Sequence, residues 1–416
     1  MELGRFSIGI GDRFGRQGAA QLAALRRARE QDVEITPVWN KSFREHTIIG
    51  TRPDDVRAGA DACVSAAQWT GPYFVDADHV GSATVDGFIA SCDFFTIDVA
   101  DYIGGAVPAD TVNSFVERCF ARGESVTIAG IETPFHVAAD RLFQTGRTYL
   151  RAIRKAGAIY RRIRDVKGDG AFVTEVSMDE TIQPQTPLEL YFILAMIAGE
   201  GIPVRTIAPK FSGAFLKGID YVGVVNRFAA EFEQDVLVVR QAVRDFGLPD
   251  TLKISVHSGS DKHSLYGPMA AILKKHGAGV HLKTAGTTWL AELAGLASSG
   301  GEGLAVARAI YAAAFGRIDE MCAPYAAVIR ITRDNLPSPM DVDRWSAGQF
   351  ASALRNDRSC PRFNPDFRQL LHVGYKAAAD MGERFYRALE SHAEATAREV
   401  TDNLYRNHVE PLFLRG

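Results

Sequence analysis

Residues 73–81 read YFVDADHVG, and this stretch carries the pattern that decides the fold. A short apolar run, typical of a strand buried on both faces, ends in a cluster of polar residues and a glycine. Seven other stretches repeat the pattern. They are FSIGIGDRF (6–14), VEITPVWNKS (33–42), FFTIDVAD (94–101), AFVTEVSMDE (171–180), VRTIAPKFSG (204–213), LKISVHSGSD (252–261) and GVHLKTAGTTW (279–289).

Segments of helical composition lie between these runs. In residues 225–247, apolar side chains recur at three- and four-residue steps, as one buried stripe of a helix requires. The stripe contains Phe228, Phe232, Val236, Val239 and Ala242. Eight strand-then-helix units within about 290 residues predict an α/β fold of the TIM type, a (β/α)8 barrel. A doubly wound open sheet is the alternative, because closure of a sheet leaves no mark in the sequence.

Two regions exceed what a barrel needs. The segment near 109–165 is longer than one crossover helix requires, and we expect it to form a helical insert. After about residue 300 the chain becomes rich in alanine and helical in pattern. We therefore expect a catalytic barrel domain over residues 1–298 and a C-terminal helical extension over 299–416, packed on the barrel.

Composition excludes several classes of partner. Among 416 residues, 47 Lys and Arg nearly balance 50 Asp and Glu, so no broad basic face is expected for nucleic acid or for membrane lipids. The five cysteines are an odd number without a CxxC pair, which argues against a disulfide framework and fits a reducing cytoplasm. No apolar stretch reaches the length of a membrane span. Homo-oligomerisation stays open.

The polar residues that end each run are the candidate site, because catalytic groups of TIM barrels come from the C-terminal ends of the strands. Residues 73–81 end in Asp76, Asp78 and His79. A neighbouring carboxylate and imidazole offer a base and a metal ligand. The alternative is structural, with Asp76 capping a loop and His79 bonded to a backbone carbonyl.

Three further strand ends could complete a metal and acid/base site. Glu180, favoured over Asp179, is a candidate general acid or ligand. The alternative is structural, with Thr181 or Asp179 capping the turn toward the next helix. His257 would face His79 across the barrel mouth. Asp220 could add the carboxylate of a two-histidine, one-carboxylate set, although an aspartate before a helix is usually an N-cap.

The remaining strand ends mix cations, hydroxyls, amides and carboxylates, which suits an anionic polyhydroxylated ligand such as a sugar acid. The candidate substrate-binding residues are Asp12, Arg13, Asn40, Lys41, Lys210, Asp261, Lys283 and Thr284. The chain contains no GxxxxGK[ST] motif, and its GxG at residues 9–11 has Phe14 in the place of the third glycine. ATP and dinucleotide cofactors are therefore not expected.

Across nearly all of residues 6–292 the sequence resembles the tagaturonate/fructuronate epimerase family of hexuronate catabolism. The resemblance rests on long motifs, among them VDADHVG, IAPKFSGAFLKGIDYVG, LKISVHSGSDKHSLY and LKTAGTTWLAELAGLA. It implies a metal-dependent sugar epimerase with Asp78 as proton acceptor and Glu180 as proton donor. It also implies that His79, Asp220 and His257 hold the metal.

The implied reaction inverts C4 of a 2-keto sugar acid, whose C4 hydrogen is not acidic. Retro-aldol cleavage of the C3–C4 bond followed by re-addition would achieve this, and transient oxidation by NAD is the rival route. The metal could be zinc, manganese, nickel or cobalt, since imidazole and carboxylate accept all of them. The other functions considered are an isomerase or aldolase acting on another sugar acid, and a catalytically silent barrel that binds a sugar acid.

Overall fold

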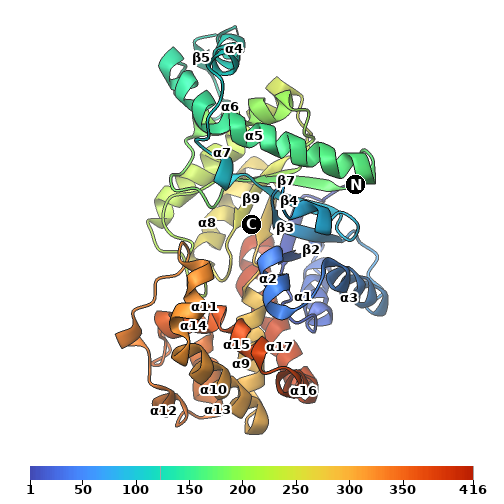
Figure 1. The fold of residues 1–416 in the computed structure, drawn as a ribbon, viewed down its shortest axis with the longest axis vertical. Helices are drawn as coiled ribbons and strands as arrows, with labels where there is room; N and C mark the ends of the chain where they lie inside the picture. The colour runs from blue at the N-terminus through green and yellow to red at the C-terminus, as the bar shows by residue number, and fades with distance from the viewer. Residues whose placement is uncertain (122, 416) are drawn as a thin grey trace.

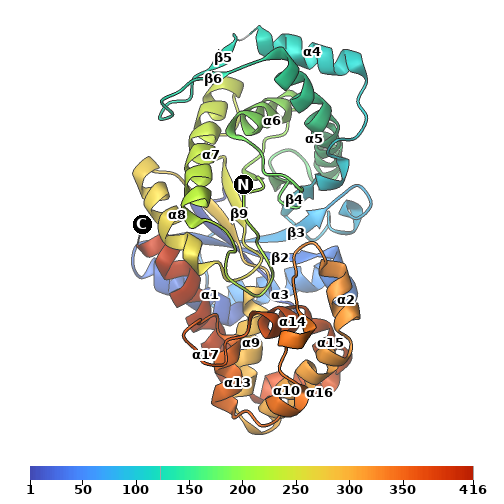
Figure 2. The ribbon, with the colours of Figure 1, turned by 90° about the vertical axis from the view of Figure 1, so that its left-hand side faces the viewer.

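The computed structural model describes residues 1–121 and 123–415 and contains a closed barrel of eight parallel strands (Figures 1 and 2). This confirms the predicted barrel and excludes the open sheet. Each predicted run contains one strand. The strands are β1 (Phe6–Ile10), β2 (Ile35–Ser42), β3 (Phe74–Val80), β4 (Phe94–Asp98), β7 (Val173–Ser177), β8 (Thr206–Ala208), β9 (Lys253–His257) and β10 (Val280–Lys283). Pairing of β1 with β10 closes the ring.

Helices connect successive strands and cover the outside of the barrel. They are α1 (Gly18–Arg29), α2 (Phe43–Ile49), α3 (Pro53–Ala66), α5 (Ala139–Lys167), α6 (Pro187–Gly199), α7 (Val225–Phe246), α8 (His263–His276) and α9 (Thr287–Ser298), with short turns η1 (Val85–Gly87) and η2 (Ala100–Tyr102). The predicted apolar stripe of residues 225–247 is confirmed, because all five of its members are buried in α7. No helix of the described residues is long and apolar enough to cross a bilayer.

The segment near 109–165 contains three kinds of element. Helix α4 (Ala109–Phe120) and a small hairpin of β5 (Ser125–Val126) with β6 (Phe135–His136) precede the long helix α5. Helix α5 runs for 29 residues, and its buried side chains include Ile153 and Ile159. It is therefore also the crossover helix between β4 and β7. Figure 1 shows α4 and β5 at the end of the molecule opposite the C-terminal helices.

Short helices after residue 300 form a second lobe with its own core (Figure 2). Its elements are α10 (Gly301–Gly316), α11 (Ile318–Cys322), η3 (Ala323–Tyr325), η4 (Arg333–Asn335), α12 (Pro339–Val342), α13 (Ala347–Leu354), α14 (Pro365–Val373), α15 (Tyr375–Asp380), α16 (Glu383–Ser391) and α17 (Ala393–Leu404). Helix α9 contributes Trp289, Leu293 and Leu296 to this second core, so it joins the two lobes.

The chain then returns to the barrel. The π-helical segment η5 (Tyr405–Leu414) buries Val409, Leu412 and Phe413 in the same core as the barrel helices. The ring of Phe413 lies 5.3 Å from the ring of Phe6 on β1. The first strand and the last helical segment therefore stabilise each other directly.

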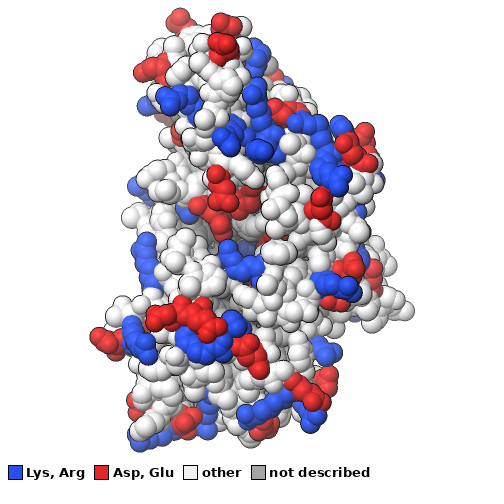
Figure 3. Space-filling view, viewed as in Figure 1, with Lys and Arg blue, Asp and Glu red and all other residues white. Residues whose placement is uncertain are grey.

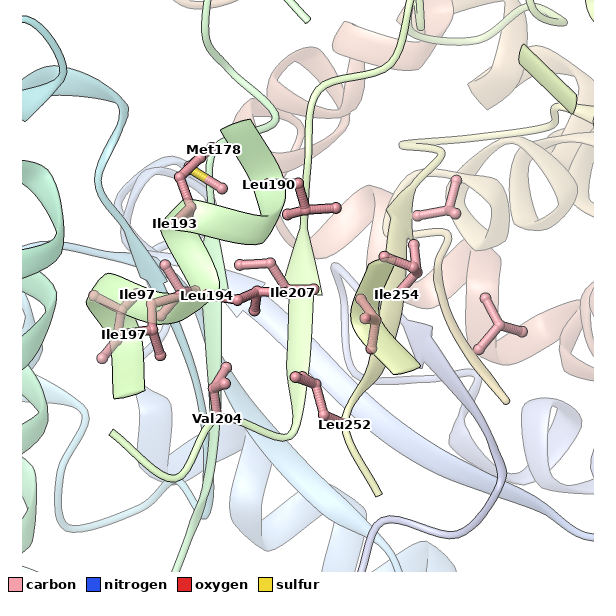
Figure 4. Close-up of a cluster of buried hydrophobic side chains, with 14 of the residues drawn as sticks. Ile97, Met178, Leu190, Ile193, Leu194, Ile197, Val204, Ile207, Leu252 and Ile254 are labelled. Atoms are coloured by element: carbon pink, nitrogen blue, oxygen red, sulfur yellow. The ribbon is translucent and has the colours of Figure 1, made fainter. Parts of the chain in front are cut away.

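Side chains alternate between the two faces of each strand, and the two faces differ in chemistry. Outward side chains such as Ile97, Ile207 and Ile254 pack against the leucines and isoleucines of α6 and its neighbours (Figure 4). The residues of β4 that alternate with Ile97 point into the barrel. There Phe94 belongs to a small apolar plug, whereas Thr96 and Asp98 are polar. Polarity thus rises toward the C-terminal ends of the strands.

One buried carboxyl lies where the barrel meets α9. Glu292 is 2% exposed and accepts a hydrogen bond of 2.8 Å from the Gln17 amide. Burial, with help from the charge of Asp12, raises the pKa of Glu292 above its usual range, although Arg13 and Arg16 oppose the shift. A folded-state pKa above the unfolded value means that the folded protein binds the proton more tightly. The resulting stabilisation is complete at pH 4 and is lost as pH rises through the folded-state pKa.

We predict that Glu292→Gln removes this pH-dependent loss of stability, because the amide side chain has the shape of the carboxyl group and cannot ionise. The difference in unfolding free energy between the variant and the parent should shift in favour of the variant between pH 5 and pH 8, by up to about 1.4 kcal/mol per pH unit. Urea denaturation at both pH values measures it. The matched change at exposed Glu30 should give a pH-independent difference, and the same result for Glu292→Gln would contradict the prediction.

Candidate functional site

Lys283 is the centre of a buried ionic network inside the barrel. Its Nζ lies 2.8 Å from Asp76, 2.8 Å from Asp78 and 3.4 Å from Glu175. All four residues are 5% exposed or less. The three carboxylates come from β3 and β7 and the ammonium from β10, so the network ties together strands from opposite sides of the ring.

Lys283 also determines the protonation of its neighbours. Burial alone would raise the carboxyl pKa values, but the ammonium holds the pKa of Asp78 below its usual range and that of Glu175 well below it. At Asp76 burial dominates, and the pKa is raised. The Asp76 carboxylate accepts hydrogen bonds from the Thr96 backbone N–H and hydroxyl, 3.1 and 3.0 Å long. Asp78 is therefore an ionised carboxylate at the mouth of the barrel.

A β-bulge turns His79 into the same mouth. The register between β3 and β4 shifts between Ala77 and Val80, and His79 has a φ of 52°, in the left-handed region. In a regular strand Asp78 and His79 would point to opposite faces. The bulge instead brings both to the inside, at a backbone cost of about 1–3 kcal/mol. The ring Nδ1 of His79 donates to Asp98 at 2.8 Å, which leaves Nε2 facing the mouth.

His257, at the end of β9, also has one ring nitrogen bonded to a carboxylate. Its Nε2 donates to Glu175 at 2.7 Å, and its Nδ1 lies 3.1 Å from an oxygen of Asp179. The His79 and His257 rings are 5.1 Å apart and nearly perpendicular. Burial lowers the pKa of His257, but Asp179 and Glu175 outweigh it and raise the pKa to about 9. Asp78 and Asp179 similarly raise the pKa of His79, against burial.

Together these residues form a candidate metal centre. One ligand atom each from His79, Asp179 and His257 lies within 4.8 Å of the other two. Each imidazole uses its second nitrogen on a carboxylate behind it, Asp98 or Glu175, which is the outer-shell pattern that orients metal-binding histidines. Five carboxylates contact Lys283 or the two histidines, namely Asp76, Asp78, Asp98, Glu175 and Asp179, and Lys283 is the one lysine among these groups. Donor set and charge therefore both fit a divalent cation.

Two residues predicted for the site do not lie in this group. Glu180 is exposed on the loop that follows β7. The Oδ1 atom of Asp220 accepts hydrogen bonds from the Tyr221 N–H at 2.8 Å and from the Ser264 hydroxyl at 3.0 Å, at the start of α8. The catalytic role of Glu180 and the ligand role of Asp220 stay predictions.

Most of the predicted substrate-binding residues bond to other protein groups. Arg13 pairs with Glu45 at 3.1 Å, and Lys41 donates to the Arg13 carbonyl at 2.7 Å. Asp12, Thr284 and Asp261 likewise accept from or donate to protein groups, whereas Lys210 is half-buried and uses its backbone N–H on Gln185. Asn40 differs, because it donates to Asp78 at 3.4 Å and its buried Oδ1 has no partner among the described residues.

The sequence interpretation missed three residues that complete the centre. Glu175 lies in the middle of β7 and Asp98 at the end of β4, and neither is among the residues predicted for the site. Asp179 was ranked below Glu180. Strand alternation could have identified Glu175. Side chains two residues apart in a strand point to the same face, and Glu175 points into the barrel together with Val173 and Ser177. A charged residue at an inward position of an apolar strand is itself a reason to expect a partner there.

A second group of ligand-type atoms, Asp261, His263 and His408, links the barrel to η5. Asp261 accepts from Arg368 at 2.8 Å and from Thr287 at 3.1 Å, and lies 3.2 Å from His408. The guanidinium already balances the carboxylate. This group therefore anchors α14 and η5 to the loop after β9. Figure 3 shows acidic and basic side chains close together near the middle of the face that it draws.

Comparison with known proteins gives consistent matches. A family model described as UxaE: tagaturonate epimerase matches residues 1–412. A curated relative from Thermotoga maritima, named tagaturonate/fructuronate epimerase, is 28% identical over 430 residues, which cover 98% of this chain and 81% of the relative.

Solved structures agree with the fold. A glycerol-complexed crystal structure of fructuronate-tagaturonate epimerase UxaE from Cohnella laeviribosi matches with a TM-score of 0.81 and 24% identity, over 98% of this chain and 81% of that one. The native structure of the same protein matches with a TM-score of 0.81 and 23% identity, over 99% and 82%. The barrel and the C-terminal lobe therefore form one architecture that is also seen in crystals.

We predict that Lys283→Met destabilises the barrel strongly, because it leaves three buried carboxylates without their cation. The unfolding free energy should fall by about 3–5 kcal/mol. Urea denaturation followed by circular dichroism measures the change. Lys274→Met, at an exposed position of α8, is the matched control and should lie within about 0.5 kcal/mol of the parent. Equal stability of the two variants would refute the role given to Lys283.

Proposed function

The chain belongs to the tagaturonate epimerase family, and from this premise we propose that it interconverts D-tagaturonate and D-fructuronate by inversion at C4, as a cytoplasmic enzyme of hexuronate catabolism. The observation that carries the proposal is the group of His79, Asp179 and His257 at the C-terminal ends of the barrel strands, next to ionised Asp78. Catalytic sites of TIM barrels lie at this end.

The reaction must invert a carbon whose hydrogen is not acidic. We propose that a base removes the proton of the C4 hydroxyl and that the C3–C4 bond then breaks. The C4–C6 fragment becomes an aldehyde that carries the carboxylate, and the C1–C3 fragment keeps the bonding electrons as an enediolate. The aldehyde turns over, the C3–C4 bond forms again on the other face, and the C4 oxygen regains a proton. No redox cofactor is consumed.

Asp78 is the proposed base. Its carboxylate is ionised beside Lys283, is oriented by Asn40, and lies next to His79 at the mouth. Glu180, on the loop after β7, is the proposed proton donor for the opposite face. Glu180 directly follows Asp179, whose carboxylate lies 3.1 Å from His257, so its backbone is next to the candidate metal centre.

We propose zinc, manganese, nickel or cobalt as the cation, held by His79 and His257 with a carboxylate from Asp179. Asp220, the ligand implied by resemblance, would have to leave Ser264 to take part. A bound cation would act as a Lewis acid on the substrate oxygens and stabilise the charge that develops as the C3–C4 bond breaks. Asp98 and Glu175 keep the two imidazoles in the tautomer and orientation that ligation needs.

The metal assignment predicts that Asp98→Asn weakens cation binding without abolishing it, because His79 keeps its ring but loses a charged acceptor. The dissociation constant for Co²⁺ should rise by about 10–100-fold. Absorption of bound Co²⁺ during titration measures it. Asp101→Asn, on the same loop and exposed, is the matched control. An unchanged constant in Asp98→Asn would show that Asp98 does not support a metal ligand.

The epimerase assignment is tested by incubating the metal-loaded protein with D-tagaturonate and following D-fructuronate by carbon-13 NMR. Asp78→Asn and Glu180→Gln should each lower kcat by about 10²–10⁴-fold, because each removes a proton-transfer group. Both variants should still bind Co²⁺ as the parent does. Absence of interconversion by the parent would refute the function, and accumulation of three-carbon fragments alone would indicate an aldolase.

A further inference from the structure

The loop between β8 and α7, residues 209–224, is fixed around Lys217 from two sides. The barrel side comes from the loop after β9, where Ser260 accepts from the Gly218 N–H at 2.9 Å and Lys262 donates to the carbonyls of Leu216 and Ile219 at 3.0 and 2.8 Å. The other side comes from the C-terminal lobe, where Arg368 donates to the Gly218 carbonyl at 2.7 Å.

The backbone of Lys217 itself belongs to this clamp. Its N–H donates to the carbonyl of Val328 in the C-terminal lobe at 2.9 Å. The next residue, Gly218, has a φ of +75°, and a Cβ there would lie 2.9 Å from the carbonyl oxygen of Arg368. Glycine is therefore required at this turn. A backbone fixed on both sides reduces the conformational freedom that the lysine side chain would lose on binding a ligand.

The Lys217 side chain extends over the end of β9. Its Nζ is 3.1 Å from the position that a Cβ on Gly259 would occupy, and Gly259 is two residues after His257. Absence of a side chain at Gly259 thus leaves room for the ammonium over the loop that follows His257, a candidate metal ligand. Lys217 is half-buried, and no carboxylate of the described residues lies within 4.0 Å of its Nζ.

This lack of a partner distinguishes Lys217 from the cations around it. Arg13 pairs with Glu45, Lys283 pairs with three carboxylates, and Lys262 donates to two carbonyls and a hydroxyl. A half-buried ammonium has lost part of its hydration and gains by pairing with an anion. The ammonium of Lys217 is therefore free to pair with an anionic group of a ligand.

The charges near Lys217 favour an anion there. His372, on α14, is buried, and both ring nitrogens lack a partner among the described residues. Burial lowers its pKa well below the usual range, and Arg13, Lys217 and Lys262 lower it further. Lys217 and Lys262 thus lie near His372 on the C-terminal-lobe side of the mouth, where the opposing carboxylate, Asp261, is paired with Arg368. The side formed by β3, β4 and β7 carries the carboxylates of the candidate metal centre.

We propose that Lys217 binds the carboxylate of the sugar acid and holds the C4–C6 fragment while its aldehyde turns over. The inference deepens the proposed function. Cleavage of the C3–C4 bond leaves the carboxylate on the fragment that has no remaining covalent link to C1–C3. An ion pair at C6 retains that fragment and still permits rotation about the C4–C5 bond, which presents the opposite face of the aldehyde to the enediolate.

The turnover test uses Lys217→Met in the metal-loaded protein with carbon-13-labelled D-tagaturonate. The KM should rise by at least about tenfold, in keeping with the loss of a charged hydrogen bond. Part of the substrate should appear as free 2-hydroxy-3-oxopropanoate and dihydroxyacetone, because the fragment escapes. Lys217→Arg should restore retention, since it keeps the charge. Lys274→Met, at an exposed position of α8 outside the site, is the control and should release no fragments.

A binding measurement separates this proposal from the epimerase assignment. D-Gluconate, an inert open-chain sugar acid, and neutral sorbitol are titrated into the parent and into Lys217→Met by calorimetry. We expect Lys217→Met to lose at least about tenfold in gluconate affinity and to bind sorbitol as the parent does. Equal gluconate affinity in the two proteins, or an equal loss in the control Lys274→Met, would overturn the proposal, whatever the parent turns over.

Discussion

The ion pairs between Lys283 and the carboxylates of β3 and β7 are the constraint on which the site depends. A buried ammonium costs several kcal/mol to desolvate, and only close carboxylates offset that cost. The same contacts orient Asp78, and Glu175 in turn orients His257. One lysine thus connects the packing of the barrel interior with the position of the proposed base, Asp78, and of His257, a candidate metal ligand.

The architecture was readable from the sequence because a short stretch rich in apolar residues that ends in polar residues recurs eight times, with helical segments between the repeats. The stripe from Phe228 to Ala242 was readable for a similar reason, since one face of α7 is buried along its length. The positions of the individual side chains near the mouth were harder to predict. Asp179 and Glu180 are adjacent, and only the turn after β7 decides that Asp179 approaches His257 while Glu180 is exposed.

Other features had no local signature at all. The inward orientation of His79 results from a bulge that pairing with β4 creates, and pairing is a property of two strands. Arg368 is more than a hundred residues from Asp261 and Gly218, yet it bonds to both. Contacts of this length arise only when the C-terminal lobe docks on the mouth. They explain why the lobe contributes to the site without supplying the metal centre.

The contact between Phe6 and Phe413 has a consequence for how the protein reaches its native state. The first strand cannot complete its packing until residue 413 has been synthesised, and it also waits for β10 to close the ring. Loops that span nearly the whole chain must close before these contacts can form, which slows folding. Until then β1 has an unpaired edge, so the nascent chain is most open to aggregation at the strand that will finally seal the barrel.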